Sequence, residues 1–236
     1  MKKIICIAAF FVFAFILADG NNWYVATNPA NNNPEAVWSI MGTSDSSCEI
    51  RYSYLNGTDW APSTTITSDS INDYDPRLAF DSSGNRKVVW WADETYDRIK
   101  FSTLPSSGGS WSTPEAVSSS SENSRNPSIV VHNGTVNICF ERIDSSGLRS
   151  VVASGQDSPN PWPEVLIAAT QRTVNLEAKI HSSGDLLWID WIDSSSNMGY
   201  SEKANDSWSS VQYEPYSGQN DIENARVRIR QTIVEN

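Results

Sequence analysis

The stretch from Ser106 to Val117, SSGGSWSTPEAV, contains turn-forming residues, a tryptophan and a short run that is typical of a β-strand. The same pattern recurs in LNGTDWAPSTTI from Leu55, in SPNPWPEVLI from Ser158 and in KANDSWSSVQY from Lys203. Each stretch has one tryptophan, and steps of 51, 51 and 46 residues separate Trp60, Trp111, Trp162 and Trp208. A period of about 50 residues indicates a structural unit that is repeated along the chain.

Two other marks keep nearly the same period. Glycines in the turns FDSSGN, VHNGT and HSSGD recur at steps of 50 and 50 residues, at Gly84, Gly134 and Gly184. An Asp or Asn precedes a strand-forming run at steps of 51, 49 and 49 residues, at Asp75, Asn126, Asn175 and Asn224. Three independent marks with one period make chance similarity a poor explanation.

The order of these marks predicts the architecture of one unit. A first strand such as 77–80 is followed by a hairpin whose glycine supplies a positive φ, and then by an apolar second strand. A third strand, the tryptophan turn and a short fourth strand complete the unit. Four antiparallel strands in about 50 residues predict an all-β fold, a β-propeller with four-stranded blades. We expect each repeated tryptophan to cover the gap between two blades.

The predicted units span about 21–68, 69–118, 119–168 and 169–217, and residues 218–236 begin a partial fifth unit. Two interpretations of this last strand stay open. It completes the first blade and closes an unusually small ring, or the chain is a fragment of a longer propeller. Incomplete blades would leave bare strand edges, which allow copies of the chain to associate.

Residues 1–18 have the pattern of a secretory signal peptide. Lys2 and Lys3 precede an apolar run over 4–17, and Ala18 is a small residue that suits cleavage. The run is short for a membrane span, and an uncleaved anchor is the alternative interpretation. We therefore expect a propeller domain over 19–236 that is secreted or held at the cell envelope, with no membrane span after signal removal.

The composition disfavours several classes of function. A formal net charge of -11 disfavours nucleic acid as a partner, because phosphate binding needs clustered Lys and Arg. After signal removal, Cys48, Cys139 and two His remain, too few for a typical structural zinc site. The two cysteines lie in different units at non-equivalent positions, so we expect no disulfide. We also expect no cofactor, and a glycan or an extracellular protein as the partner.

The repeated turn resembles the BNR or Asp-box repeat of sialidase-like propellers. That box reads roughly Ser-x-Asp-x-Gly-x-Thr-Trp, and this chain keeps Ser106, Gly108 and Trp111 of it without the Asp. The other turns keep less, with Gly57 and Trp60 in one and only Trp208 in another. The resemblance covers about 23–236 and implies the propeller fold. Such propellers include hydrolases, lectins and modules without known activity, so the resemblance leaves the activity open.

Ligands of propellers usually bind at the mouth of the central channel, which the first strands line. Charged residues near the start of these strands make a candidate site for an anion or a sugar, and they are Arg77, Glu177, Arg226 and Arg228. The alternative is a solvated or salt-paired surface. A second set lies on the second strands, where aromatic rings beside carboxylates would suit a sugar: Trp91, Glu141, Asp190 and Trp191. We align Trp91, Glu141 and Trp191 with one another, and interpret Asp190 as the least core-like; the alternative is a blade-to-blade core.

The resemblance to sialidases also implies a catalytic set, namely three Arg, a Tyr–Glu nucleophile pair and an Asp acid. This chain has no Arg-Ile-Pro motif, and no Tyr–Glu pair is placed by spacing, so we assign no catalytic residue. Three hypotheses follow. The chain is a secreted non-catalytic module that binds glycan or protein, an exo-glycosidase of the sialidase-like class, or an architectural piece of a larger propeller.

Overall fold

A computed structural model describes residues 23–41, 47–156, 162–169, 178–192, 197–204 and 207–214. These residues form eighteen strands and no helix, which confirms the predicted all-β class. The signal segment 1–18 and the partial unit 218–236 lie outside the described residues. Within the described part of the chain, no helix has the length and apolar character needed to cross a membrane.

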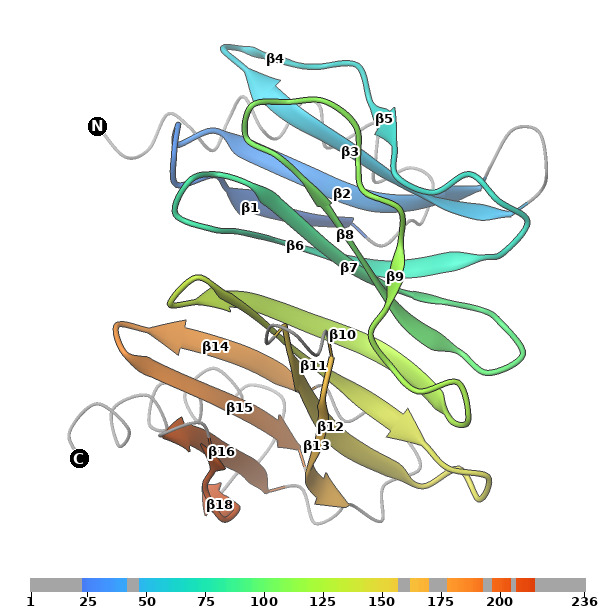
Figure 1. The fold of residues 1–236 in the computed structure, drawn as a ribbon, viewed down its shortest axis with the longest axis vertical. Helices are drawn as coiled ribbons and strands as arrows, with labels where there is room; N and C mark the ends of the chain where they lie inside the picture. Colours follow the sequence, from blue (N-terminus) through green and yellow to red (C-terminus); the bar gives the residue numbers. More distant parts are fainter. Residues whose placement is uncertain are drawn as a thin grey trace.

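The strands form four antiparallel sheets, each from one continuous part of the chain (Figure 1). The first sheet contains β1 (Trp23–Thr27), β2 (Pro34–Met41), β3 (Cys48–Asn56), β4 (Asp59–Trp60) and β5 (Thr64–Thr65). The second contains β6 (Asp73–Phe80), β7 (Arg86–Ala92), β8 (Arg98–Leu104) and β9 (Glu115–Ala116). The third contains β10 (Asn123–His132), β11 (Thr135–Ile143), β12 (Arg149–Gly155) and β13 (Glu164–Ala169). The fourth contains β14 (Lys179–Ser183), β15 (Leu186–Ile192), β16 (Met198–Ala204), β17 (Ser207–Trp208) and β18 (Gln212–Glu214).

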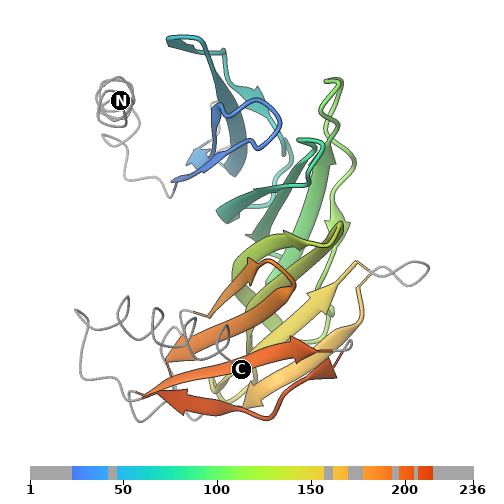
Figure 2. The same ribbon diagram turned by 90° about the vertical axis from the view of Figure 1, so that its left-hand side faces the viewer.

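The sheets follow one another along an arc (Figure 2), and their first strands lie innermost. β6 contacts β1 on one side and β10 on the other, and β10 contacts β14. In the second, third and fourth sheets, the hairpin between the first and second strands has the predicted glycine at a positive φ, with values of 78°, 81° and 58° at Gly84, Gly134 and Gly184. The corresponding hairpin of the first sheet has no glycine, and Asn32 has the positive φ there, at 58°. This arrangement is the one expected of successive propeller blades.

The hydrophobic core lies between neighbouring sheets. Val37 and Ile50 of the first sheet pack against Val88 and Trp90 of the second, and equivalent clusters join the second to the third and the third to the fourth. Three of the repeated tryptophans belong to these clusters at half-buried positions, namely Trp111, Trp162 and Trp208. Trp162, for example, meets Phe101 of the preceding sheet edge-on at 5.1 Å between ring centroids. The predicted role of these tryptophans between blades is therefore confirmed.

Serine hydroxyls hold the tryptophan turns against the third strands. Ser53 Oγ donates a 2.6 Å hydrogen bond to the carbonyl of Ala61, the residue that follows Trp60. Ser102 and Ser201 make the same bond at 2.8 and 2.9 Å, to Ser112 and Ser209. The same hydroxyl bond therefore helps to hold the repeated turn in each of these three sheets.

The first strands begin earlier than the sequence pattern predicts. β6 and β10 start at Asp73 and Asn123, and the predicted strand starts Asp75 and Asn126 lie inside them with φ of 50° and 52°. Strand pairing is interrupted there, between Tyr74 and Arg77 and between Arg125 and Ser128. Each Asx–Pro pair therefore forms a β-bulge that bends the inner strand, because the extra residues have no partner in the ladder.

Two asparagines, Asn72 and Asn123, close the loops before these strands. Asn72 Oδ1 accepts a 2.9 Å hydrogen bond from the backbone N–H of Cys48 in the first sheet. Asn123 Oδ1 accepts an equivalent 2.9 Å bond from the N–H of Asp97 in the second. Each inner strand is therefore tied to the third strand of the sheet before it.

Candidate ligand-binding site at the start of the inner strands

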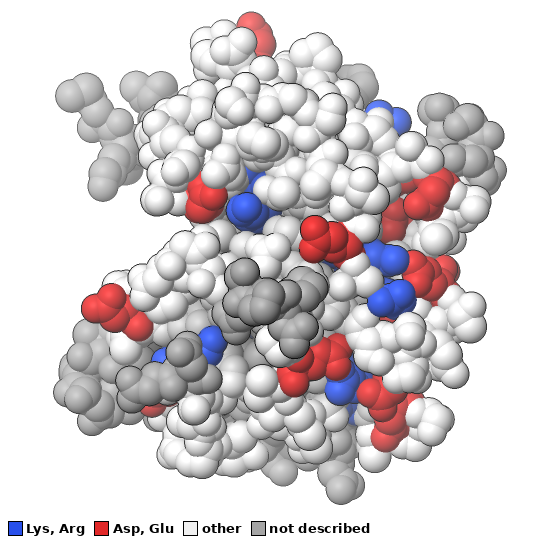
Figure 3. All heavy atoms as spheres, in the orientation of Figure 1, with Lys and Arg blue, Asp and Glu red and all other residues white. Residues whose placement is uncertain are grey.

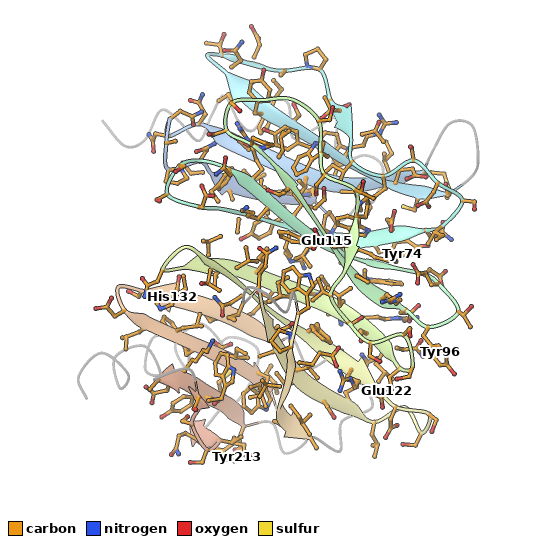
Figure 4. The ribbon with its side chains drawn as sticks, viewed as in Figure 1. Tyr74, Tyr96, Glu115, Glu122, His132 and Tyr213 are labelled. Carbon is orange, nitrogen blue, oxygen red and sulfur yellow. The ribbon has the colours of Figure 1, made fainter. Side chains whose placement is uncertain are left out.

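An aromatic and cationic cluster lies where the inner strands of the second and third sheets begin. The rings of Tyr74 and Trp91 lie 4.5 Å apart between centroids at an interplanar angle of 33°. The guanidinium carbon of Arg125, from β10, lies 4.7 Å from the centre of the Trp91 ring. We call Tyr74, Trp91 and Arg125 the Trp91 cluster. Figure 4 shows Tyr74 on the side of the molecule from which Tyr96 and Glu122 also project, whereas His132 projects from the opposite side.

Two aspartates hold the Trp91 cluster in position. Trp91 Nε1 donates a 2.9 Å hydrogen bond to Asp75, so the bulge in β6 orients the indole. Arg125 pairs with the buried carboxylate of Asp97 through Nε, while 42% of its side chain is exposed. The guanidinium is therefore fixed over the ring and also accessible to solvent. A ring face and an accessible guanidinium are the groups that recognise a sugar ring and its polar substituents.

Arg77 lies three residues beyond Tyr74 on β6 and is half-buried. Its Nη1 donates a 2.9 Å hydrogen bond to the carbonyl of Pro76, and its guanidinium carbon lies 5.7 Å from the ring centre of Tyr24. It makes no ion pair with any described residue. A guanidinium without a carboxylate partner retains the capacity to bind an anionic ligand.

The other described candidates are buried. Glu141 is fully buried and pairs with Arg149 Nη1, so it is not beside an exposed ring as the sequence analysis expects. Asp190, interpreted as the least core-like residue, is also fully buried, and its Oδ2 lies 2.7 Å from His181 Nε2. Both carboxylates therefore have internal basic partners, which compensate for the loss of water.

Trp191 is a core residue of the fourth sheet. It packs against Cys139 and Ile189 in the cluster between the third and fourth sheets, as Trp90 does between the first and second. The predicted alignment of Trp191 with Trp91 and Glu141 is wrong by one residue, because pairing of Lys179 with Asp190 sets the strand register. A shift of one residue moves a side chain to the other face of a strand.

The structure contains a Tyr–Glu pair that spacing did not reveal. Tyr52 OH donates a 2.5 Å hydrogen bond to Glu35, and Arg86 holds the same carboxylate through Nη2 at 2.8 Å and Nε at 2.9 Å. Both members of the pair are buried, and Tyr52 packs edge-on against Trp111 at 5.2 Å. Burial and the hydrogen bond to Glu35 raise the pKa of Tyr52, which opposes its ionisation.

No metal centre is evident among the described residues, which contain no group of three or more His, Cys, Asp or Glu side chains suited to hold an ion. Cys48 and Cys139 are both free thiols and buried, as the expectation of no disulfide requires. Three candidates of the sequence analysis lie outside the described residues, namely Glu177, Arg226 and Arg228.

The fold is similar to that of sialidases and trans-sialidases in solved structures. Trypanosoma rangeli sialidase in complex with the inhibitor DANA matches 80% of this chain at 10% identity and a TM-score of 0.54. The leech intramolecular trans-sialidase complexed with 2,7-anhydro-Neu5Ac matches 85% at 10% identity and a TM-score of 0.60. The intramolecular trans-sialidase from Ruminococcus gnavus in complex with oseltamivir carboxylate matches 83% at 9% identity and a TM-score of 0.60.

This chain spans only 37%, 52% and 70% of those three chains, respectively. No protein-family model and no curated protein matches the sequence. The TM-scores of 0.54 to 0.60 support a sialidase-like β-propeller fold. Sequence identities of 9% to 10% carry no information about activity. The repeat family, the number of blades and the closure of the ring stay predictions.

Proposed function

We propose that this chain is a non-catalytic glycan-binding propeller module that acts outside the cell, with Arg77 and the Trp91 cluster as its binding site. The observation that carries the proposal is the guanidinium of Arg77, which lacks a carboxylate partner among the described residues and lies on the same strand as Tyr74. The half-buried Tyr74 and the exposed part of Arg125 would contact the sugar, while the Trp91 indole, which packs against both, would hold them in place. Arg77 would take a negatively charged substituent, so an acidic glycan is the ligand that suits the site.

Binding without hydrolysis is supported by the state of the acidic residues. Glycoside hydrolysis by two carboxyl groups requires both to reach the scissile bond. Glu35, Glu141 and Asp190 are buried and lie beside basic partners. Tyr52 is buried as well and its pKa is raised, both of which oppose its use as a nucleophile. An action outside the cell rests on the predicted signal segment 1–18.

The proposal is tested by titration of the purified chain with 3′-sialyllactose in a calorimeter, for the natural sequence, Arg77→Ala and Lys87→Ala. Lys87 is the matched control, since it also loses one positive charge but lies near the hairpin end of β7, where Nζ contacts Thr103. We expect Arg77→Ala to weaken binding by roughly tenfold or more, because one charge-assisted contact is lost. We expect the affinity of Lys87→Ala to lie within about twofold of that of the natural chain.

Two outcomes would contradict the proposal. Equal affinity in Arg77→Ala and Lys87→Ala would remove Arg77 from the site. Release of free sialic acid during the titration, measured by chromatography, would instead favour the exo-glycosidase hypothesis. Detection of the chain in the culture medium of cells that express 1–236, but not of cells that express 19–236, tests its export.

A further inference from the structure

The outer strand of the third sheet differs from those of the other sheets. β13 has six residues, whereas β5 and β9 have two each and β18 has three. It pairs with β12 along one edge and with no described strand along the other. Short edge strands and charged residues are the usual protection of a sheet against added strands. The sequence of β13, EVLIAA, has one charged residue, Glu164 at its start, and no charged residue or proline over 165–169.

Apolar side chains of β13 are accessible. Leu166 is 58% exposed and Val165 is 45% exposed, on adjacent positions that face opposite sides of the strand. They are the only pair of sequence neighbours among the exposed aliphatic residues of the described chain. An apolar strand with an unpaired edge is a template to which another extended segment can add.

Pro163 changes the tryptophan turn that precedes β13. In the other three sheets, the residue after the tryptophan donates its N–H to a carbonyl of the third strand, as Ala61 does to Tyr54 at 2.9 Å. Pro163 has no N–H, so this bond is absent from the third sheet. Ser154, the counterpart of Ser53 and Ser102, has a buried hydroxyl without a hydrogen-bond partner. The described part of the third sheet therefore lacks both hydrogen bonds that hold the residue after the tryptophan in the other three sheets.

The start of β13 lies between two hollows. A hollow of about 440 Å³ separates it from the end of β9 and is lined by Val117, Ser118, Trp162 and Glu164, among others. A smaller hollow of about 80 Å³ lies on the side of the fourth sheet and is lined by Ser154, Pro163, Val165 and Lys203, among others. A segment that runs along β13 can place side chains into these hollows, which is how added strands acquire specificity.

Three carboxylates, those of Glu115, Glu122 and Glu164, lie around the larger hollow beside two guanidiniums, those of Arg98 and Arg142. Glu122 and Glu164 share one cation, Arg142, with Glu122 at 3.0 Å from its Nε. Glu115 is exposed, and Trp162 Nε1 donates a 3.4 Å hydrogen bond to its carboxylate. Figure 3 shows acidic and basic side chains gathered along this side of the molecule. With a net charge of -11, a second copy of this chain is electrostatically disfavoured as the occupant, and a basic segment is favoured.

We propose that the free edge of β13 is the docking site for an extended segment of a partner protein, in which apolar residues alternate with Lys or Arg. The segment adds to the third sheet beside β13, its backbone bonds to the free edge, and its apolar side chains cover Leu166 and enter the larger hollow. This surface is separate from the glycan site, because it lies on the outermost strand of the sheet, whereas Arg77 lies on an innermost one.

The test is fluorescence anisotropy with three fluorescein-labelled ten-residue peptides. One alternates Val with Lys, one alternates Val with Glu, and the third is the Val–Lys peptide with alternate backbone nitrogens methylated. The chain is used as the natural sequence, as Leu166→Lys and as Tyr213→Lys. Tyr213 is the matched control, since it is 57% exposed on the outer strand of the fourth sheet. Equal melting temperatures of the three chains are checked first, and Leu166→Gln replaces Leu166→Lys if they differ.

We expect the Val–Lys peptide to bind the natural chain and Tyr213→Lys with equal affinity, and Leu166→Lys at least roughly tenfold more weakly. The Val–Glu peptide and the methylated peptide should bind weakly or not at all, since one has the wrong charge and the other lacks backbone donors. Equal binding by the methylated peptide, equal binding by Leu166→Lys, or no binding of the Val–Lys peptide would each overturn the proposal. Light scattering that finds a dimer in the natural chain and a monomer in Leu166→Lys would also overturn it, by assigning the edge to a second copy.

Discussion

At the level of single residues, the ionisation of Asp73 makes the stability of the fold depend on pH. Its carboxyl is buried between the first and second sheets, where Trp90 Nε1 donates a 2.7 Å hydrogen bond to Oδ1. Burial raises the pKa of Asp73 from 3.8 to about 7, because the charged form loses its hydration, and hydrogen bonds only partly oppose this. The folded chain therefore binds a proton that the unfolded chain releases between these two pH values. We predict that the free energy of unfolding falls as pH rises through this window, by up to about 1.4 kcal/mol per pH unit, and levels off above it.

The matched variant for this prediction is Asp73→Asn, which keeps the shape of the side chain and removes its titration. Urea unfolding of both chains at intervals between pH 4 and pH 8 supplies the measurement. The natural chain should lose stability relative to Asp73→Asn as pH rises. Parallel curves for the two chains would show that Asp73 is ionised in the folded state throughout.

A second prediction concerns the close contact between Gly199 and the indole of Trp191. A Cβ added to Gly199 would lie 2.7 Å from the Trp191 indole, closer than packed atoms approach. We predict that Gly199→Ala destabilises the chain by about 1–3 kcal/mol, because the buried indole has to move. Gly155→Ala is the control, since its Cβ would lie 3.5 Å from the nearest atom, Asn137 Oδ1. Thermal melting of the two variants should separate them, and equal melting temperatures would show that the indole adjusts without cost.

At the level of strands and loops, the hydrogen bond of the Asn123 side chain joins two neighbouring sheets, and its contribution to stability can be predicted. Its side chain satisfies the N–H of Asp97 across the boundary between the second and third sheets. We predict that Asn123→Ala costs about 1–3 kcal/mol of unfolding free energy, because the N–H is left without its partner. Asn72→Ala should cost a similar amount, since Asn72 makes the equivalent bond to Cys48. Asn56→Ala, at an exposed position, serves as the control in the same urea titrations and should change little.

These elements also show what the sequence can and cannot reveal. Repeated tryptophans and hairpin glycines are visible in the sequence because each has one physical role that recurs in three of the four sheets. The register of β15 is not visible, because Gly184 is the first of the two residues that connect β14 to β15, whereas Gly134 is the second of the two that connect β10 to β11. Alignment by these glycines therefore shifts β15 by one residue, so that Trp191 faces the third sheet and Ile192 packs on the opposite face of the fourth. Arg125 was missed for another reason: it acts through Trp91 of the neighbouring sheet, and no spacing within one unit indicates such a contact.

In the candidate site too, some features can be recognised in the sequence and others only in the structure. Arg77 is recognisable from its position near the start of a first strand, and the structure leaves it without an acidic partner among the described residues. Glu141 and Asp190 resemble it in the sequence, as charges in apolar strands. Their partners Arg149 and His181 lie on adjacent strands, so only the strand pairing shows that these charges are satisfied internally.

At the scale of the whole molecule, the two described cysteines report whether the sheets unfold together. Cys48 belongs to the first sheet and Cys139 to the third, and burial raises the pKa of both thiols. Every core cluster between sheets draws side chains from two neighbours, so no sheet can lose its structure without exposing the next. We predict that neither thiol reacts with iodoacetamide in the native chain, and that both become reactive over the same range of urea.

Peptide mapping of the alkylated chain measures each cysteine separately at every urea concentration, and it excludes Cys6 of the signal segment. If both cysteines become reactive over the same range of urea, the hydrophobic clusters between neighbouring sheets make the sheets unfold together. If Cys48 reacted at clearly lower urea than Cys139, the first sheet would unfold on its own, as repeat proteins with weak interfaces between units do. That outcome would mean that the clusters between sheets contribute less stability than the ladders within them, and it would make the first sheet the place where unfolding starts.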